Sequence, residues 1–387
     1  MWSHSGEARG EVVSSLVELE ALAPEWRALA TARGNAFLTP EWFFAWLRHY
    51  GDLAEAAAVV VRRADGRVRG LVPLVEDRAG PVRCLRFCGS NLGDHFHPVA
   101  RPEDELRVAG EAARLLASGG RRWRALALDN VSAEARWWRE LVRSAPLPLA
   151  TAAYRGDSLP FIDLRGQTWD DYMASRSRNV RSQIRRKTRT LEREHGAVFR
   201  RTAGPAELDR DLDSLFRLHD ARWRALGGST LATERSRAFH RDFAAAALER
   251  GWLRLWLLEV DSEPVAAWYG WCLGGRYSYY QAGFSPRWGR FSVGFVLLAH
   301  TMRMAVDEGV EEYDLLRGAE AYKARFATAE RRVHTVVVTG ARDPVRLVVG
   351  GEAMLWRAQR KLPDRARRWL RSASRGLPGP VSSGQRR

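Results

Sequence analysis

The sequence predicts an α+β protein of two domains, each built as a mixed, mainly antiparallel twisted sheet flanked by helices. The chain has 387 residues, is 45% hydrophobic and contains 16 tryptophans, so it exceeds one typical domain and can fill two cores. Strand-like and helix-like segments alternate in mixed order, and the order after residue 160 resembles that of the first half. We expect a first domain over residues 1–155, a second over 156–342, and a separate basic segment over 343–387.

The first domain is expected to begin with helices. Apolar spacing predicts one helix over residues 22–34 and another after Pro40. Two β-branched runs then flank the turn residues Asp65 and Gly66, which predicts a β-hairpin. The elements expected after this hairpin are a helix over 103–118, a strand over 123–130 and a tryptophan-rich helix.

The second domain is expected to contain a long helix over 167–195 and a strongly apolar helix over 292–309. The latter has Ser292 as a plausible N-cap and Gly309 at its end. Three consecutive strands, separated by turn residues, precede it. The remaining expected elements are a strand near 197–204, helices over 205–226 and 233–250, a strand running into a loop over 311–318, a short helix over 319–327 and a final strand over 331–340.

The net charge of +16 is concentrated in two segments. Residues 176–193 carry eight basic side chains against one acidic, and residues 357–387 carry ten against one. The rest of the chain is neutral, so a general affinity of the whole surface for nucleic acid is not expected. No segment has the apolar run of a signal peptide or a membrane-spanning helix, and we therefore expect a cytoplasmic protein.

Several motifs in the second half occur together and resemble one family. They are His219 with Arg222 and Trp223, the strand 279–284, Gly294 at a helix start, and the run 313–323 with its Arg317-Gly318 pair. Together, over residues 160–340, they resemble GNAT-type acyltransferases. More narrowly they are similar to the CelD-like branch, which is associated with cellulose and other exopolysaccharide biosynthesis and is related in architecture to the Fem peptidyltransferases with their two tandem GNAT domains.

The resemblance implies a reaction and its substrates. The donor would be an acyl-CoA such as acetyl-CoA, with no metal, and the acceptor an amine or hydroxyl on a small molecule or a carbohydrate- or lipid-linked compound. Fem-like relatives use aminoacyl-tRNA instead, and the general GNAT signature Arg/Gln-x-x-Gly-x-Gly/Ala is represented here only by Gly294. Both donors therefore stay open at this point.

The start of the helix at residue 292 is the predicted binding site for the pyrophosphate of the donor. Free backbone N–H groups and the helix dipole favour anions there. Arg287 and Arg290, in the preceding loop, could add charge-assisted contacts. An ordinary amphipathic core helix would show the same pattern. The residues assigned to the donor are Arg287, Arg290, Ser292, Val293, Gly294 and Phe295.

The predicted catalytic residues lie just after the strand that ends near Asp314. Acyl transfer from a thioester needs a proton for the leaving thiolate, which Tyr322 could donate. Lys323, Asp314 or Glu320 could orient or deprotonate the acceptor. Alternatively, Tyr322 packs on the sheet, Lys323 faces solvent, and Asp314 caps the chain or pairs with Arg317.

Further polar residues are candidates for holding the acceptor or assisting catalysis. His219 lies three positions before Arg222 on a helix, although a lone helix histidine is more often structural. A glycine-containing loop in the first domain could line an acceptor cleft. Its two histidines could also bind a metal, but with no further ligand nearby in sequence this is the less favoured interpretation. The residues assigned to substrate binding, apart from the basic helix, are Arg222, Tyr280, Gln281, Arg317, Asp94, His95 and His97.

The first basic segment is predicted to be an amphipathic helix. Arg178, Arg181, Arg185 and Arg189 lie on one face, with Val180, Ile184 and Leu191 opposite. This stripe could bind phosphates of a nucleotide- or lipid-linked acceptor, of coenzyme A or of tRNA. A solvated helix face is the other interpretation.

The C-terminal segment and the basic helix together leave a non-catalytic function open. Leu355, Leu362, Ala366 and Trp369 share one side of a basic helix that could lie on an anionic membrane surface or cover a sheet edge. A GNAT-fold protein without activity could bind nucleic acid or a membrane through these patches. Nucleic acid is the weaker option, because no aromatic residue lies between Arg176 and Arg193. Cys84, Cys88 and Cys272 are expected to be buried apolar residues.

Overall fold

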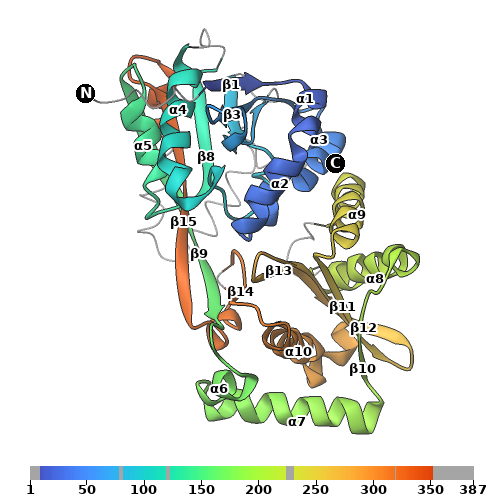
Figure 1. Cartoon of the computed structure of the whole chain (residues 1–387). Helices are drawn as coiled ribbons and strands as arrows, with labels where there is room; N and C mark the ends of the chain where they lie inside the picture. Colours follow the sequence, from blue (N-terminus) through green and yellow to red (C-terminus); the bar gives the residue numbers. More distant parts are fainter. Residues whose placement is uncertain (1–8, 78–81, 119–122, 224–230, 319, 352–387) are drawn as a thin grey trace. The chain divides into compact units, whose positions relative to one another are not determined.

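The chain folds into two compact units that are connected by two strands. The computed structural model describes residues 9–77, 82–118, 123–223, 231–318 and 320–351, apart from the side chains of 154 and 155. Unit 1 comprises Met1–Asp157 with the chain from Arg332 onward, and unit 2 comprises Ser158–Arg331 (Figure 1). The chain enters unit 2 along β9 (Leu149–Asp163) and leaves it along β15 (Ala329–Gly340).

Unit 1 contains strands in the orders β1-β3-β4-β7 and β15-β8-β6-β5-β2. All of these pairs are antiparallel except β6 with β8. The predicted hairpin is confirmed, since β3 pairs with β4 across the Asp65-Gly66 turn. The elements are β1 (Arg9–Val13), α1 (Leu16–Ala21), α2 (Ala23–Ala32), η1 (Ala36–Leu38), α3 (Pro40–Tyr50), β2 (Ala54–Ala56), β3 (Ala58–Arg62), β4 (Val68–Val72), β5 (Leu74–Asp77), β6 (Cys84–Phe87), β7 (Val99–Ala100), η2 (Pro102–Asp104), α4 (Glu105–Ser118), β8 (Ala125–Ser132) and α5 (Trp137–Ser144).

Unit 2 is a twisted sheet in the order β10-β11-β12-β13-β14-β9. Its pairs are antiparallel except for β13 with β14. The predicted mixed, mainly antiparallel sheets are therefore confirmed in both units. The elements are α6 (Trp169–Ala174), α7 (Arg178–His195), β10 (Val198–Arg201), α8 (Pro205–Trp223), α9 (Glu234–Glu249), β11 (Leu253–Val260), β12 (Glu263–Leu273), β13 (Arg276–Phe284), η4 (Pro286–Phe291), α10 (Val293–Asp307), β14 (Glu312–Asp314) and η5 (Lys323–Arg325).

Helices cover both faces of the unit 2 sheet. Helices α8 and α9 pack on one face, and α10 packs on the other and is itself contacted by α6 and α7 (Figure 1). The contact of α8 with β13 is very close, because a Cβ on Gly283 would lie 2.3 Å from the backbone nitrogen of His219. Only glycine fits there, so this residue fixes how the end of α8 approaches the sheet.

Two predicted details of unit 2 are wrong, and a third, the N-cap position of Ser292, is confirmed in position only. The helix expected over 167–195 is divided into α6 and α7, because the Ser177 side chain accepts from Val180 N and starts a new helix. The short helix expected over 319–327 is reduced to the 3₁₀ turn η5. Ser292 does precede α10, but it lies in the left-handed region (φ 56°) and its side chain does not cap the helix.

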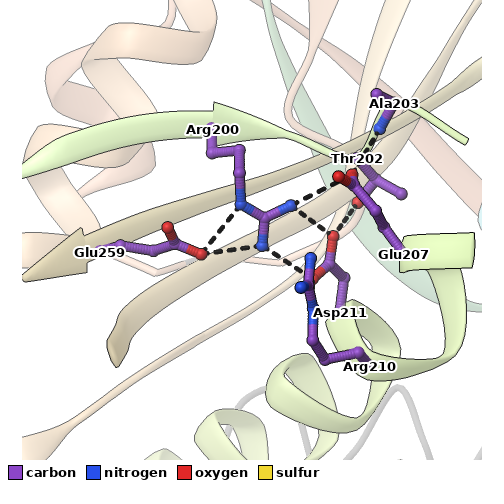
Figure 2. Close-up of polar contacts among 7 residues, drawn as sticks. All are labelled: Arg200, Thr202, Ala203, Glu207, Arg210, Asp211 and Glu259. Carbon is purple, nitrogen blue, oxygen red and sulfur yellow. Dashed lines mark hydrogen bonds and ion pairs between the residues drawn. The ribbon is translucent and has the colours of Figure 1, made fainter. Parts of the chain in front are cut away.

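A partly buried ion network joins β10, α8 and β11 (Figure 2). Arg200 donates to both carboxylate oxygens of Asp211 at 2.8 Å and to Glu259 at 2.8 and 3.0 Å. Thr202 donates a further hydrogen bond of 2.7 Å to Asp211, whose side chain is only 1% exposed. Because Asp211 belongs to α8, this network anchors the helix that carries His219 and Arg222.

The structure bears on two further predictions, the burial of the cysteines and the lack of a membrane-spanning helix. Cys88 is buried as expected, while Cys84 and Cys272 are half-buried. Within the described ranges, no helix is both long and apolar enough to cross a bilayer. The predicted amphipathic segment around Leu355 and Trp369 lies outside the described residues.

Candidate active site

Two parallel strands diverge in the middle of unit 2. Strand β14 pairs with β13 only at Arg276, Tyr277 and Ser278, and β14 ends at Asp314. Strand β13 continues to Phe284, still paired with β12 on its other side. One edge of β13 therefore has no β14 partner beyond Ser278, and its backbone groups there can meet a ligand.

A β-bulge in β13 lies at the point of divergence. Gly270 of β12 is opposite Tyr279, and the next β12 register pair joins Tyr269 to Gln281, so Tyr280 is the extra residue. The bulge sends neighbouring tyrosines to different surroundings. Tyr279 stacks on Trp268 in the α10-side core, whereas the Tyr280 ring contacts Tyr269 on the α8 and α9 side.

Two tyrosine hydroxyls and one guanidinium meet beside this bulge. The hydroxyl oxygens of Tyr322 and Tyr279 are 3.2 Å apart. Arg222, from the end of α8, interacts electrostatically with both hydroxyls and donates to the Ala282 carbonyl at 3.2 Å. A guanidinium only donates, so Arg222 cannot accept a proton from either hydroxyl. The three side chains form one polar group, which we name the Arg–Tyr–Tyr group.

The Tyr322 hydroxyl is held in its protonated form. Burial raises the pKa of Tyr322 well above its usual value, and the neighbouring Tyr279 raises it further, against the opposing effect of Arg222. A tyrosine with a raised pKa keeps its proton at neutral pH. It therefore acts as a hydrogen-bond donor, as in its bond to Tyr279.

Lys323 organises the loop that presents Tyr322. Its ammonium is buried and donates to the carbonyl oxygens of Arg317 at 2.8 Å and Leu316 at 3.5 Å, and it pairs with Glu320 at 3.1 Å. Gly318 has φ 138°, a conformation that favours glycine. The interpretation that Lys323 faces solvent is therefore wrong, and its contacts are those of a positioning residue.

Asp314 lies in an ion cluster below the point of divergence. Its carboxylate accepts from Leu316 N at 2.8 Å and lies 3.5 Å from Arg331, rather than pairing with Arg317. Burial raises the pKa of Asp314, and Arg276 partly offsets this effect. Asp314 is 2% exposed, so these contacts fit a structural role.

The start of α10 is open to an anion. Among the described residues, no protein acceptor pairs with the N–H groups of Val293 and Gly294, as expected for the first turn of a helix. The Ser292 hydroxyl accepts from Lys187 Nζ at 2.7 Å, which places an ammonium at this helix start. The predicted Arg287 and Arg290 are exposed in η4 just before it.

Phe284 joins this helix start to the Arg–Tyr–Tyr group. A Cβ on Gly294 would lie 3.1 Å from the Phe284 ring. The Arg222 guanidinium lies over the same Phe284 ring, 5.3 Å from its centre. Phe284 therefore lies between Gly294, one of the predicted donor-binding residues, and Arg222.

His219 and Gln281 form a separate pair behind β13. Their side chains are 3.0 Å apart, and His219 is 1% exposed. Burial lowers the pKa of His219 to about 4, so the imidazole is neutral at physiological pH. His240 and the bulged Tyr280 lie on the same side, with ring centres 5.4 Å apart. His219 thus supports the strand that carries the site.

The other predicted ligand residues belong to α7 and to unit 1. Arg178 and Arg185 are exposed on α7, but Arg181 is not free, because it donates to the carbonyls of Ala174 and Arg176 at 2.9 Å. The loop of Asp94, His95 and His97 belongs to unit 1. There His97 is buried, and its Nδ1 lies 2.8 Å from the carbonyl oxygen of the next residue, Pro98. This side chain therefore supports the loop.

Three contributors were not predicted from the sequence: Tyr279, Phe284 and Lys187. The doubled tyrosine at 279 and 280 was a visible signal, but alternation alone could not show which of the two turns toward Tyr322. No local sequence pattern marks Phe284 or Lys187. Phe284 contacts Gly294 in another element, and Lys187 contacts Ser292, which is distant in sequence.

Diverging parallel strands, a bulge and an open helix start define the class of this protein as one with a GNAT-type fold. Residues 178–324 match the family model described as an acetyltransferase (GNAT) domain. This range runs from α7 to η5 and contains the whole Arg–Tyr–Tyr group. No curated protein matches the chain in sequence.

Solved structures extend the likeness to both units. The chain is similar to FemX, with a TM-score of 0.62 and 12% identity over 84% of this chain and 98% of that one. It is also similar to L-PGS from Bacillus licheniformis, with a TM-score of 0.53 and 14% identity over 88% of this chain and 96% of that one. A third similar structure is the C-terminal domain of a candidate lysylphosphatidylglycerol synthetase from Agrobacterium fabrum, with a TM-score of 0.53 and 14% identity over 87% of this chain and 97% of that one. At these identities the likeness is one of fold.

Proposed function

We propose that unit 2 transfers an acyl group from an acyl-CoA, acetyl-CoA in the simplest case, to an amine or hydroxyl of an acceptor. The observation that carries the proposal is the Arg–Tyr–Tyr group at the divergence of β13 and β14. Tyr279 and Tyr322 together carry two hydroxyl protons, and one of these protons forms the hydrogen bond between them. The other proton is left for a ligand, because Arg222 can only donate.

The donor has a matching binding surface. Its pyrophosphate would lie at the N–H groups of Val293 and Gly294, where the dipole of α10 favours an anion. Lys187 and the exposed Arg290 add positive charge at this helix start. The unpaired edge of β13 offers backbone partners to the amide-containing arm of coenzyme A.

The chemistry then requires one proton transfer at each end. The acceptor nitrogen or oxygen forms a bond to the thioester carbonyl carbon, and the carbon–sulfur bond breaks. The spare tyrosine proton goes to the departing thiolate. The acceptor gives up one proton, to Glu320 or water, and the tyrosine pair is reprotonated in turn, so protons balance over the cycle. Arg222 stabilises the phenol oxygens while their proton is shared.

The class of acceptor is proposed from the family resemblance. An acceptor in polysaccharide or cell-envelope biosynthesis, either a small molecule or a carbohydrate- or lipid-linked compound, is typical of the CelD-like branch. A similar fold occurs in a protein named for lysylphosphatidylglycerol synthesis, which would act on a phospholipid. Aminoacyl-tRNA is the competing donor, and a cytoplasmic protein peripheral to the inner membrane face would suit either.

The proposal is tested with the Tyr322→Phe variant. We expect this variant to bind acetyl-CoA as the wild type does, measured by calorimetry. Thiol release from acetyl-CoA with a panel of amine and alcohol acceptors should fall by about a hundred-fold or more, a typical loss for a missing acid.

Tyr277→Phe, on the strand that carries Tyr279, is the matched control. It also removes one tyrosine hydroxyl, which accepts from Trp256 at 2.9 Å and lies in the core. We expect it to lower the melting temperature without changing turnover. Full turnover of Tyr322→Phe would remove this residue from the mechanism, and absence of any heat of acetyl-CoA binding to the wild type would remove the donor.

A further inference from the structure

Helix α7 carries a row of arginines that other residues do not neutralise. Arg178, Arg185, Arg186, Arg189 and Arg193 are all exposed. At 100° per residue they fall within about a quarter of the helix circumference and extend over about 22 Å. We name them the α7 arginine face.

Several arginines elsewhere on the surface have carboxylate partners. Arg143 pairs with Glu140 at 2.7 Å, Arg165 with Asp163 at 2.5 Å, and Arg241 with two aspartates at 2.5 and 2.8 Å. None of the five residues of the α7 arginine face forms an ion pair within the described part of the chain. A paired arginine has little attraction left for an external anion, so these five arginines in one row give α7 a positive potential that the paired ones do not have.

The orientation of this face is fixed by the opposite side of the helix. Val180, Ile184 and Leu191 are buried in the core of unit 2. Lys187, on the same inner side, reaches the Ser292 hydroxyl at 2.7 Å. The helix therefore cannot rotate its arginines inward, and the row remains directed to solvent.

We propose that the α7 arginine face binds the phosphate groups of anionic lipids and holds the protein on a membrane surface. A straight row of guanidinium groups fits a planar array of headgroups, and each arginine near such a surface adds about 1 kcal/mol, or about five-fold in binding. RNA is less well matched, because no aromatic side chain lies among these arginines to stack on bases.

Residues next to the end of α7 support this choice. The rings of Trp288 and Phe291, both partly exposed, contact His195, the last residue of the helix. Arg290 lies over the Phe291 ring at 4.6 Å. Aromatic rings combined with basic residues are typical of proteins at the membrane–water interface. The membrane would thus be met close to the start of α10.

The experiment measures binding of the full-length protein to vesicles of equal parts phosphatidylglycerol and phosphatidylcholine. The α7 variant replaces Arg178, Arg185, Arg189 and Arg193 by Gln, which preserves helix propensity. The matched control replaces four ion-paired arginines, Arg114, Arg143, Arg165 and Arg241, by Gln. A third variant replaces Arg365, Arg367, Arg368 and Arg371 by Gln, because the C-terminal segment is also basic.

The proposal predicts that the α7 variant binds these vesicles about a hundred-fold less tightly or worse. The control should change by less than about three-fold, and the wild type should lose affinity as salt is raised. The same four positions changed to Lys should retain binding, which separates charge from folding. A smaller variant, Arg185→Gln with Arg189→Gln, should lose about 25-fold.

Several results would overturn the proposal. The wild type could bind phosphatidylcholine vesicles equally well, the α7 variant could bind like the wild type, or the C-terminal variant alone could account for the loss. If the α7 variant lost binding to a duplex RNA probe but bound vesicles like the wild type, the α7 arginine face would be assigned to nucleic acid instead. No acyl donor is present in these assays, so their outcome is independent of the proposed transfer reaction.

Discussion

The Lys323 ammonium donates to the carbonyl oxygen of Arg317 at 2.8 Å, and this bond closes the loop that follows β14. Lysine suits the place because a compact ammonium has three donors, which here meet Leu316, Arg317 and Glu320. The planar guanidinium of arginine could not direct its donors in the same way. One of only three lysines in the chain is thus used to hold Tyr322 beside Tyr279.

Lys323→Met is expected to destabilise the protein by about 2 kcal/mol, because two backbone carbonyls lose a buried donor. It should also lower turnover, since Tyr322 is no longer held at 3.2 Å from Tyr279. Urea unfolding and thiol release measure the two effects. Glu320→Gln keeps the carbonyl contacts of Lys323 and should cost less stability; equal loss in both variants would show that the ion pair, not the loop closure, matters.

Gly294→Val is expected to raise the Kd for acetyl-CoA at least about ten-fold. The added side chain must occupy space where a Cβ already lies 3.1 Å from the Phe284 ring, next to the free N–H groups of α10. Gly289→Ala is the control, because a Cβ there meets nothing within 4 Å. Calorimetry with acetyl-CoA measures both. Unchanged affinity of Gly294→Val would place the donor elsewhere.

Asp211→Ala is expected to cost about 3 kcal/mol of stability, since it removes the main partner of the Arg200 guanidinium. Asp213 lies on the same helix as Asp211 and pairs with Arg241 of α9, but its carboxylate is 65% exposed. Asp213→Ala should therefore cost less than about 1 kcal/mol of stability. Chemical denaturation of both variants tests the difference. Similar losses would mean that burial of Asp211 adds nothing to the strength of this network.

Two buried histidines predict how stability depends on pH. Burial lowers the pKa of His219 to about 4 and that of His240 to about 3. In the unfolded chain both titrate near 6.5. Between pH 6.5 and 4 the unfolded state therefore binds protons that the folded state does not, and each histidine removes about 1.4 kcal/mol per pH unit as pH falls. Above pH 6.5 this contribution is constant.

His240→Phe isolates one of these two groups. The ring remains in its aromatic surroundings but cannot be protonated, and neither ring nitrogen of His240 has a hydrogen-bond partner in the described part of the chain. Urea unfolding at pH 7, 6 and 5 should show a slope of stability against pH that is smaller by about 1.4 kcal/mol per unit. An unchanged slope would mean that His240 is already charged or solvated in the folded protein.

Most elements of the fold could be predicted from local patterns. The hairpin at Asp65-Gly66 and the strands β11 to β13 follow from turn residues between apolar runs, because these patterns act over a few residues. The break between α6 and α7 depends on capping by Ser177, which competes with a helix pattern on both sides. The turn at Lys323 is not a full helix because its ammonium takes backbone carbonyls as partners.

The candidate site was predictable in part. Family resemblance directed attention to Tyr322, Arg222 and Gly294, and the structure brings these three residues to one site through Phe284. The role of Tyr279 depends on the bulge, which is a property of the pairing between β12 and β13. No local sequence pattern reports such a pairing.

The sequence by itself determined the α+β class, the alternation of its elements and the concentration of charge on α7, because propensity, periodicity and charge are local properties. Tertiary structure decided which polar groups meet. The Tyr322–Tyr279 pair, the Arg200–Glu259 pair and the Lys187–Ser292 hydrogen bond join residues that are distant along the chain. Their distances depend on how strands and helices pack, and packing is a property of the whole unit.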